Sequence, residues 1–146
     1  AFDVVFTTMY EVGQRGMEVA AYTQQPDLVV SIGAVPATDV PGSLNKEGRV
    51  ELGQGVCMAL TDAGFAYPRN TVEAWSKAAK EAGIKSRVVQ YAPDAAQAGY
   101  AALCRNGALA LSLLIPCRTP AAPAGIMKKS DLNEAVAMLK LIAEKC

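Results

Sequence analysis

Apolar residues along the chain occur in short runs that alternate with segments of helical spacing. Residues 2–6 form an apolar run, and residues 28–32 form a near-continuous one, which is typical of a strand covered on both faces of a parallel sheet. The predicted order is strand 2–8, helix 13–24, strand 28–32, strand 50–60, helix 70–83, strand 86–91, helix 94–106, strand 108–115 and a helix from Ser130. Such alternation predicts an α/β fold of three layers, in which helices lie on both faces of a mixed, mostly parallel sheet.

Several local signals refine these elements. Gly53 and Gly55 interrupt the predicted strand 50–60 and indicate a bulge or a close backbone approach. Asn70 or Thr71 is the expected cap of the helix that ends at Gly83, and Trp75 falls on its apolar face. Gly107 is expected to close the helix 94–106. Ser130 is the expected cap of the last helix, whose predicted apolar face is Leu132, Ala135, Val136, Leu139 and Ile142.

Length and composition narrow the possible classes of protein. With 146 residues, of which 51% are hydrophobic, and no net charge, we expect one globular domain over residues 1–146. Balanced charge without a long basic run argues against a nucleic-acid partner. The longest apolar run, 107–116, is too short to span a membrane.

Histidine is absent, and this changes the chemistry available to the chain. Its absence excludes Ser-His-Asp and Cys-His triads made within the chain, and it removes the commonest ligand of zinc and cobalt. The four cysteines have no CxxC or zinc-finger spacing. We therefore expect buried, reduced thiols in a cytoplasmic protein, with a bridge between Cys104 and Cys117 as the alternative.

The turn at residues 8–16 is the main candidate site. It joins the apolar run 2–6 to a helical pattern, and such turns lie at the carboxyl end of an open α/β sheet, where ligands bind. Glu11 lies at its mouth, and Gly13 and Gly16 allow the backbone to bend and to pack closely.

Residues 10–16, Tyr-Glu-Val-Gly-Gln-Arg-Gly, resemble the Glu-Glu-Val-Gly-x-Arg-Gly motif of the deblocking or glutamyl aminopeptidases, metallopeptidases that assemble as tetrahedral dodecamers. Residues 36–42 resemble that family's Pro-Ala-Gly-Asp-Thr-Pro-Gly loop, residues 92–96 its Gly-Thr-Asp-Ala-Gly segment, and residues 115–118 its Ile-Pro-Thr-Arg segment. The resemblance covers the whole chain but only the second half of a family member. It implies the second half of a zinc-aminopeptidase catalytic domain.

The resemblance also implies which positions carry function. The family's general base corresponds to Tyr10, whose hydroxyl has a pKa near 10 and does not accept a proton from water at neutral pH. The adjacent metal ligand corresponds to Glu11, which is kept. An aspartate ligand corresponds to Gly33 and a histidine ligand to Ala121. Arg118 and Asp94 match family positions that would bind substrate or a partner. Glu11 alone does not form a metal site, so further ligands would have to come from elsewhere.

Simpler roles exist for each of these residues. Glu11 has the spacing to pair with Arg15 on the helix. Asp39 and Asp94 lie in loops that contain proline, where aspartate commonly bonds its own backbone. Arg118 has the alternative of a structural ion pair, and Cys57 and Cys117 are nucleophiles only if a base comes from elsewhere.

Two functions of different class follow. The first is a non-catalytic subunit of peptidase-like fold, kept for assembly or for binding a peptide or partner, without a cofactor of its own. The alternative is a metal-dependent aminopeptidase, in which a missing N-terminal half or a partner chain supplies ligands for two divalent ions such as zinc or cobalt. Either function implies a homo- or hetero-oligomer. A weaker possibility is different chemistry through Tyr10 or Cys117.

Overall fold

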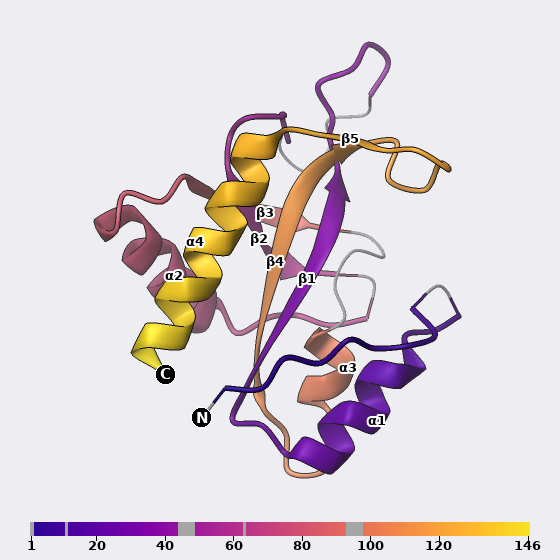
Figure 1. Cartoon of the computed structure of the whole chain (residues 1–146), viewed down its shortest axis with the longest axis vertical. Coiled ribbons are helices and arrows are strands. Elements are labelled where there is room, and N and C mark those ends of the chain that lie inside the picture. Colours follow the sequence, from indigo (N-terminus) through magenta and orange to yellow (C-terminus); the bar gives the residue numbers. More distant parts are fainter. Residues whose placement is uncertain (1, 11, 44–48, 63, 93–97) are drawn as a thin grey trace.

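The computed structural model describes residues 2–10, 12–43, 49–62, 64–92 and 98–146. A five-stranded sheet forms the middle of the molecule, with helices packed around it (Figure 1). The strands are β1 (Leu28–Pro36), β2 (Val56–Thr61), β3 (Ser86–Tyr91), β4 (Leu109–Arg118) and β5 (Ile126–Met127), and the helices are α1 (Arg15–Gln24), α2 (Arg69–Glu81), α3 (Ala98–Ala102) and α4 (Lys129–Lys145).

The sheet has the strand order β1-β4-β2-β3, and β5 pairs with the end of β4. The longer pairings, β1 with β4 and β2 with β3, are parallel, whereas β2 and β5 each meet β4 in antiparallel fashion over two residue pairs. The parallel register sets the ends of β1 and β4 side by side, with Pro36 opposite Cys117. The predicted α/β fold with a mixed, mostly parallel sheet is confirmed.

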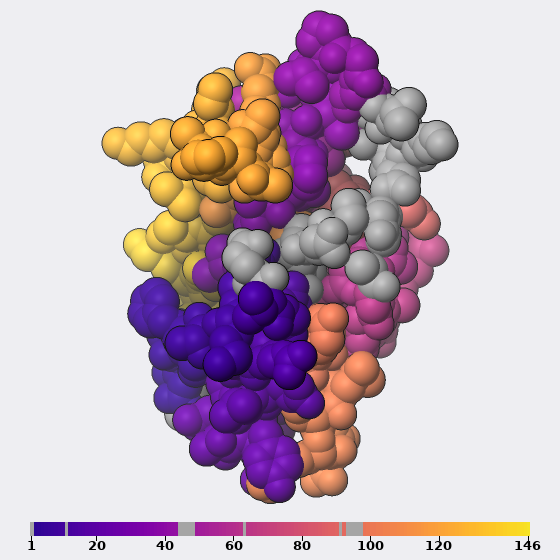
Figure 2. Space-filling view, turned by 90° about the vertical axis from the view of Figure 1, so that its right-hand side faces the viewer, coloured from indigo at the N-terminus to yellow at the C-terminus, as the bar shows by residue number. Residues whose placement is uncertain are grey.

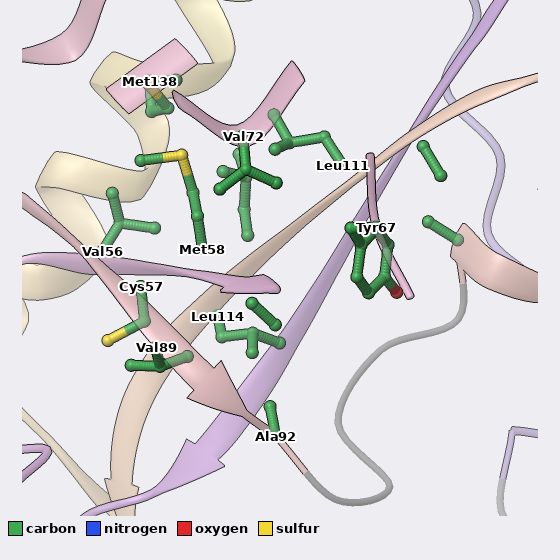
Figure 3. Close-up of a cluster of buried hydrophobic side chains, with 14 of the residues drawn as sticks. Val56, Cys57, Met58, Tyr67, Val72, Val89, Ala92, Leu111, Leu114 and Met138 are labelled. Carbon is green, nitrogen blue, oxygen red and sulfur yellow. The ribbon is translucent and has the colours of Figure 1, made fainter. Parts of the chain in front are cut away.

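The core lies on both sides of β4 and β2. Helices α2 and α4 pack on one face of these strands, and α3 packs on β4 and β1 with α1 beside it (Figure 1). Figure 3 shows Met58, Val72, Leu111 and Met138 gathered between the sheet and these helices, all fully buried. Trp75 packs against this core, as its place on the helix predicts.

Two strands extend further than the sequence indicates. The prediction ended them at residues 32 and 115, because Gly33, Pro36 and Pro116 are read as breakers. The pairing of β1 with β4 nevertheless continues to Pro36 and Cys117. Proline is tolerated there because β2 pairs with β4 only at Leu113 and Leu114, before Pro116.

The predicted strand 2–8 is wrong. Within the described part of the chain these residues form no strand, and the side chains of residues 2–6 are exposed. The physical reason is the lack of a neighbour, because an extended apolar segment becomes a strand only when another strand accepts its hydrogen bonds. Figure 1 shows this segment, in indigo, running across the front of the sheet before it reaches α1.

Two other boundaries and one helix cap are corrected. β2 begins at Val56 and not at residue 50, since Gly53 and Gly55 have left-handed φ angles of 90° and 91°. A side chain at Gly55 would overlap the backbone of Lys85, so the expected close approach is confirmed. α3 is shorter than predicted and ends at Ala102; residues 93–97 lie outside the described part. The helix 70–83 is confirmed as α2, although Pro68 takes the position of its cap.

The predicted face of the last helix is confirmed only in part, since Ala135 and Ile142 are buried and Leu139 packs against the core. Its buried residues are Asp131, Ala135, Met138 and Ile142, while Leu132 and Val136 are exposed. Lys128, and not Ser130, occupies its cap position. The stripe of buried residues has the same spacing as the predicted one but is rotated, and it begins with a charged residue that an apolar pattern does not detect.

Among the helices of the described residues, none is both long enough and apolar enough to cross a membrane.

Candidate functional site

The turn that precedes α1 is held in an uncommon backbone conformation. Met9, Gly13 and Gln14 have positive φ angles of 58°, 93° and 57°. The Gln14 amide donates to the Tyr10 carbonyl at 3.3 Å, and the Gly16 amide donates to the Thr8 carbonyl at 3.2 Å. A side chain on Gly16 would overlap the Thr8 backbone, so the predicted close packing is confirmed. Positive φ at non-glycine residues costs free energy and is concentrated at functional sites.

The candidate residues of this turn are only partly described. Tyr10 lies in the turn and is exposed at its edge. Glu11 lies outside the described residues, and so does Asp94, so the proposed roles of both remain predictions. The side-chain oxygen of Gln14 is buried without a hydrogen-bond partner among the described residues. The turn therefore has a polar atom directed inward that no described residue satisfies.

Arg118 is engaged with Asp39 at the carboxyl ends of β4 and β1. Its Nε donates to Asp39 Oδ1 at 2.9 Å and its Nη2 donates to Oδ2 at 3.0 Å, which is a bidentate pair. The Leu52 amide also donates to Asp39 Oδ2 at 3.3 Å. The hydrogen bond from the Arg118 guanidinium lowers the pKa of Asp39 to about 2. The alternative role of Arg118 as an ion-pair partner is therefore present in the structure.

The loop that carries Asp39 is also fixed by its neighbour. The Thr38 amide donates to the Val50 carbonyl at 2.8 Å, and the Val50 amide donates to Thr38 Oγ1 at 2.9 Å. Together with the Arg118 pair, these bonds hold the segment after β1 against residues 49–52. They lie at the end of the sheet where β1 and β4 meet.

The two positions that resemble metal ligands lie in different surroundings. Gly33 is inside β1, opposite Leu114 in the parallel pairing, and not after the strand as predicted. Ala121 lies in the exposed loop between β4 and β5. Neither residue has a side chain that coordinates a metal ion.

The described residues do not fit a dimetal centre. Among them, no group of three or more histidine, cysteine, aspartate or glutamate side chains lies close enough together to hold one ion. A catalytic zinc site uses three protein ligands and a position left open for water. The part of the chain that the structure describes thus lacks the ligands of even one such zinc site. No chemical step through a metal ion follows from these residues.

The thiols do not offer a nucleophile. Cys57 and Cys117 are buried, and Cys104 and Cys146 are also free, so the alternative bridge between Cys104 and Cys117 is absent from the structure. Burial raises the pKa of the Cys57 thiol to about 12. A thiol with such a pKa is protonated at neutral pH and inert.

Asp131 is a key residue that sequence reasoning did not identify. Its carboxylate is fully buried and accepts hydrogen bonds from the amides of Gly53 at 2.6 Å and Gly55 at 2.9 Å. These bonds join the start of α4 to the segment before β2. Two glycines one residue apart, with an aspartate in the first turn of a helix, are a signal for such a contact, but the separation of 78 residues hides it.

Comparison with known proteins identifies the family. Residues 1–138 match the model of the family described as M42 glutamyl aminopeptidase. "Putative aminopeptidase FrvX" of Escherichia coli (strain K12) is 27% identical over 140 residues, which are 92% of this chain and 39% of FrvX.

Solved structures agree in fold. Aminopeptidase APDkam598 of the archaeon Desulfurococcus kamchatkensis superposes with a TM-score of 0.89 at 26% identity, covering 96% of this chain and 40% of that protein. The TET1 peptidase of Pyrococcus horikoshii, which can assemble into a tetrahedron or a large octahedral shell, superposes with a TM-score of 0.82 at 20% identity, over 94% of this chain and 39% of that one. This chain thus spans about two-fifths of the length of these relatives. It belongs to the M42 glutamyl aminopeptidase family and corresponds to the C-terminal part of its members.

Proposed function

We propose that this chain is a non-catalytic, aminopeptidase-like subunit that serves assembly or the binding of a peptide or partner. The observation that carries this proposal is the set of side chains at the family's functional positions. Tyr10, Gly33 and Ala121 stand where the resemblance implies a base and two metal ligands, and the chain has no histidine. With Glu11 alone, one carboxylate does not hold two divalent ions.

The state of Arg118 supports the same proposal. A guanidinium that binds a substrate carboxylate needs free donors, but Arg118 gives two of its donors to Asp39. That pair leaves Arg118 with a structural role at the end of the sheet and fewer donors for a ligand. The assembly role has support from the family, in which the Pyrococcus horikoshii TET1 peptidase forms large shells. We infer an oligomer for this chain on the same ground.

The free thiols and the net charge of the chain support a proposal for its compartment and its class of partner. Four free cysteines suit the reducing cytoplasm, where we place the chain. A net charge of zero gives no attraction to nucleic acid or to an anionic membrane surface, so we expect protein or peptide partners.

Metal analysis together with a hydrolysis assay tests the proposal. We expect the purified chain to bind no stoichiometric zinc or cobalt and to leave leucyl- and glutamyl-p-nitroanilide intact. Tight binding of two ions with hydrolysis of either compound would overturn it. Any hydrolysis that belongs to this chain should be lost in Glu11→Gln, because this substitution removes the one metal ligand that the resemblance implies. Glu18→Gln, on the surface of α1, is the matched control and should leave such hydrolysis unchanged.

The second candidate is a metal-dependent aminopeptidase that is completed by another polypeptide. The close packing of Gly16 on Thr8 favours it, since Gly16 belongs to the motif that carries the family resemblance and its position leaves no room for a side chain. The test is to repeat both assays in the presence of the polypeptide that completes the fold. Activity that appears only then, and that Glu11→Gln abolishes, would replace the non-catalytic proposal with this one.

A further inference from the structure

Two serines meet inside the longest strand pairing of the sheet. β1 and β4 pair over nine residue pairs, and eight of these contain only apolar residues, glycine, proline or cysteine. The remaining pair is Ser31 with Ser112. A slip of the pairing by one residue would place each hydroxyl opposite an apolar side chain. The serine pair therefore belongs to this register alone.

Both serine hydroxyls are buried without a hydrogen-bond partner. Ser31 is 3% exposed and Ser112 is fully buried, and no described residue makes a hydrogen bond to either Oγ atom. The two hydroxyls thus do not bond each other directly. Most buried polar side-chain atoms in proteins have a partner, and a hydroxyl without one is destabilising. Two such groups at paired positions indicate that a small polar molecule lies between them.

The serine pair lies on the face of the sheet that α3 covers. Side chains alternate along a strand, and Leu111 packs toward α2 and α4, so Ser112 points to the opposite face. Ser31 shares that face because it is paired with Ser112 in parallel register. On this side α3 packs on β4 and β1, and Figure 2 shows it in orange beside α1, in indigo and purple.

The covering helix has no polar side chain to offer. The buried residues of α3 are all alanine or glycine: Ala98, Gly99, Ala101 and Ala102. Residues of this size fill little of the space above the strands, and their side chains neither donate nor accept hydrogen bonds. The helix thus separates the two hydroxyls from solvent without satisfying them.

Tyr67 brings a third oxygen to the same place. Its side chain is 4% exposed, and its hydroxyl donates to Asp62 Oδ2 at 2.8 Å, so its oxygen remains able to accept. Burial and the bond to Asp62 raise the pKa of Tyr67, whereas the Ser112 hydroxyl and the Gly99 amide act to lower it. Both of these groups therefore lie near the Tyr67 oxygen. Three oxygens from three segments of the chain converge beneath α3.

The spacing of the strands suits one water molecule between the serines. Neighbouring strands lie about 4.8 Å apart, and side chains at paired positions keep about that separation. Two oxygens that bond the same water at about 2.8 Å, with a tetrahedral angle between the bonds, lie about 4.6 Å apart. A direct bond between them would need about 2.8 Å. Buried waters typically make about three hydrogen bonds to groups that are otherwise unsatisfied.

We propose that Ser31, Ser112 and Tyr67 bind one internal water molecule between the sheet and α3. Each serine hydroxyl donates to the water, and the water donates to the Tyr67 oxygen. The water joins β1, β4 and the segment before α2, and it fixes the register of the longest strand pair. This site belongs to the fold itself and depends neither on metal ligands nor on a partner.

A crystal structure of the chain at a resolution that shows ordered water tests the site directly. We expect one water at about 2.5–3.0 Å from both serine Oγ atoms and from the Tyr67 hydroxyl. A direct bond between the serine hydroxyls, an empty site, or another residue in the place of the water would overturn the proposal.

A double-mutant cycle tests the shared water in solution. Ser31→Ala and Ser112→Ala each remove one partner of the water and leave the other hydroxyl unsatisfied. We expect each to raise the unfolding equilibrium constant, measured by urea denaturation, by about fivefold to tenfold. In the double variant both hydroxyls are gone, so we expect a rise no larger than that of either single variant.

Hydroxyls that hold no water would behave in the opposite way. Each substitution would then remove an unsatisfied polar group and lower the unfolding constant, and the two effects would multiply. A fall in either single variant, or a double variant equal to the product of the two, would overturn the shared water.

Ser86→Ala is the matched control for the cycle. Ser86 begins β3, at the opposite edge of the sheet from β1. We expect its effect to multiply with that of Ser31→Ala, as the effects of independent sites do. Coupling of the same size between Ser31 and Ser86 would show a general change in the sheet, and it would overturn the assignment of the coupling to a shared water.

Discussion

The two ends of this sheet differ in how their apolar residues are used. Around β2 and β4, Met58, Leu111, Leu113 and Met138 are fully buried between the sheet and helices α2 and α4. At the other end, the N-terminal arm (residues 2–6) and Ile32 of β1 expose large apolar side chains. The difference teaches that an apolar sequence pattern makes a segment able to form a buried strand. Whether the segment is buried depends on a neighbouring strand or helix that covers it.

This comparison predicts where stability resides. In the isolated chain, the end of the sheet packed by α2 and α4 supplies the apolar contacts that hold the fold, whereas the arm contributes little. Variants at the two ends should therefore differ in how much they lower the free energy of unfolding.

The largest effect is expected in the core. Leu111→Ala removes a fully buried side chain between β4 and the α2 and α4 layer, leaving a cavity. We expect a loss of about 2–5 kcal/mol in the free energy of unfolding, measured by urea denaturation. A loss below about 1 kcal/mol would mean that the side chains around Leu111 are loosely packed in solution, although the structure buries them fully.

A smaller loss is expected at the buried carboxylate. Asp131→Ala leaves the amides of Gly53 and Gly55 without their acceptor and separates the start of α4 from β2. Since hydrogen bonds to charged groups contribute about 1.5–3 kcal/mol each, we expect a loss of about 2–4 kcal/mol by the same assay. Glu144→Ala, at an exposed position of the same helix, is the control and should change stability by less than about 1 kcal/mol.

Acid sensitivity is expected at the other end of β4. Asp39 has a folded pKa of about 2, below its ordinary value, so its pairing stabilises the protein above pH 4 and this contribution is lost as the pH falls toward 2. Arg118→Met removes the partner, and the folded pKa of Asp39 should rise toward its ordinary range.

Stability measured between pH 2 and pH 5 checks this prediction. The slope of stability against pH should be smaller in Arg118→Met than in the unmodified chain, and Arg105→Met, at an exposed arginine that lies over Tyr22, should retain the original slope. An unchanged slope in Arg118→Met would mean that other groups set the pKa of Asp39.

How much of this fold is readable from the sequence depends on the range of the interaction. β3 and α2 were predicted with near-correct bounds because periodicity and glycine signals within a few residues define them. β1 and β4 were predicted too short, since Pro36 and Pro116 are breakers by local rules and become acceptable only through the register between distant strands.

The candidate site shows the same limit. The close packing at Gly16 followed from a local turn pattern and is present in the structure. The pairs of Arg118 with Asp39 and of Asp131 with Gly53 join residues 79 and 78 positions apart, and no local pattern predicts them. The strand at residues 2–8 was predicted from its apolar run alone, although strand formation depends on a neighbour that the described part of the chain does not provide.

The smallest effect is expected where the apolar pattern is strongest but uncovered. Phe6→Ser replaces a side chain that is 94% exposed, so it removes almost no buried surface. In the isolated chain we expect a change in the free energy of unfolding within about 0.5 kcal/mol, measured by urea denaturation beside Leu111→Ala. A loss above about 1 kcal/mol would show that the arm is packed in solution and that the two ends of the sheet are alike.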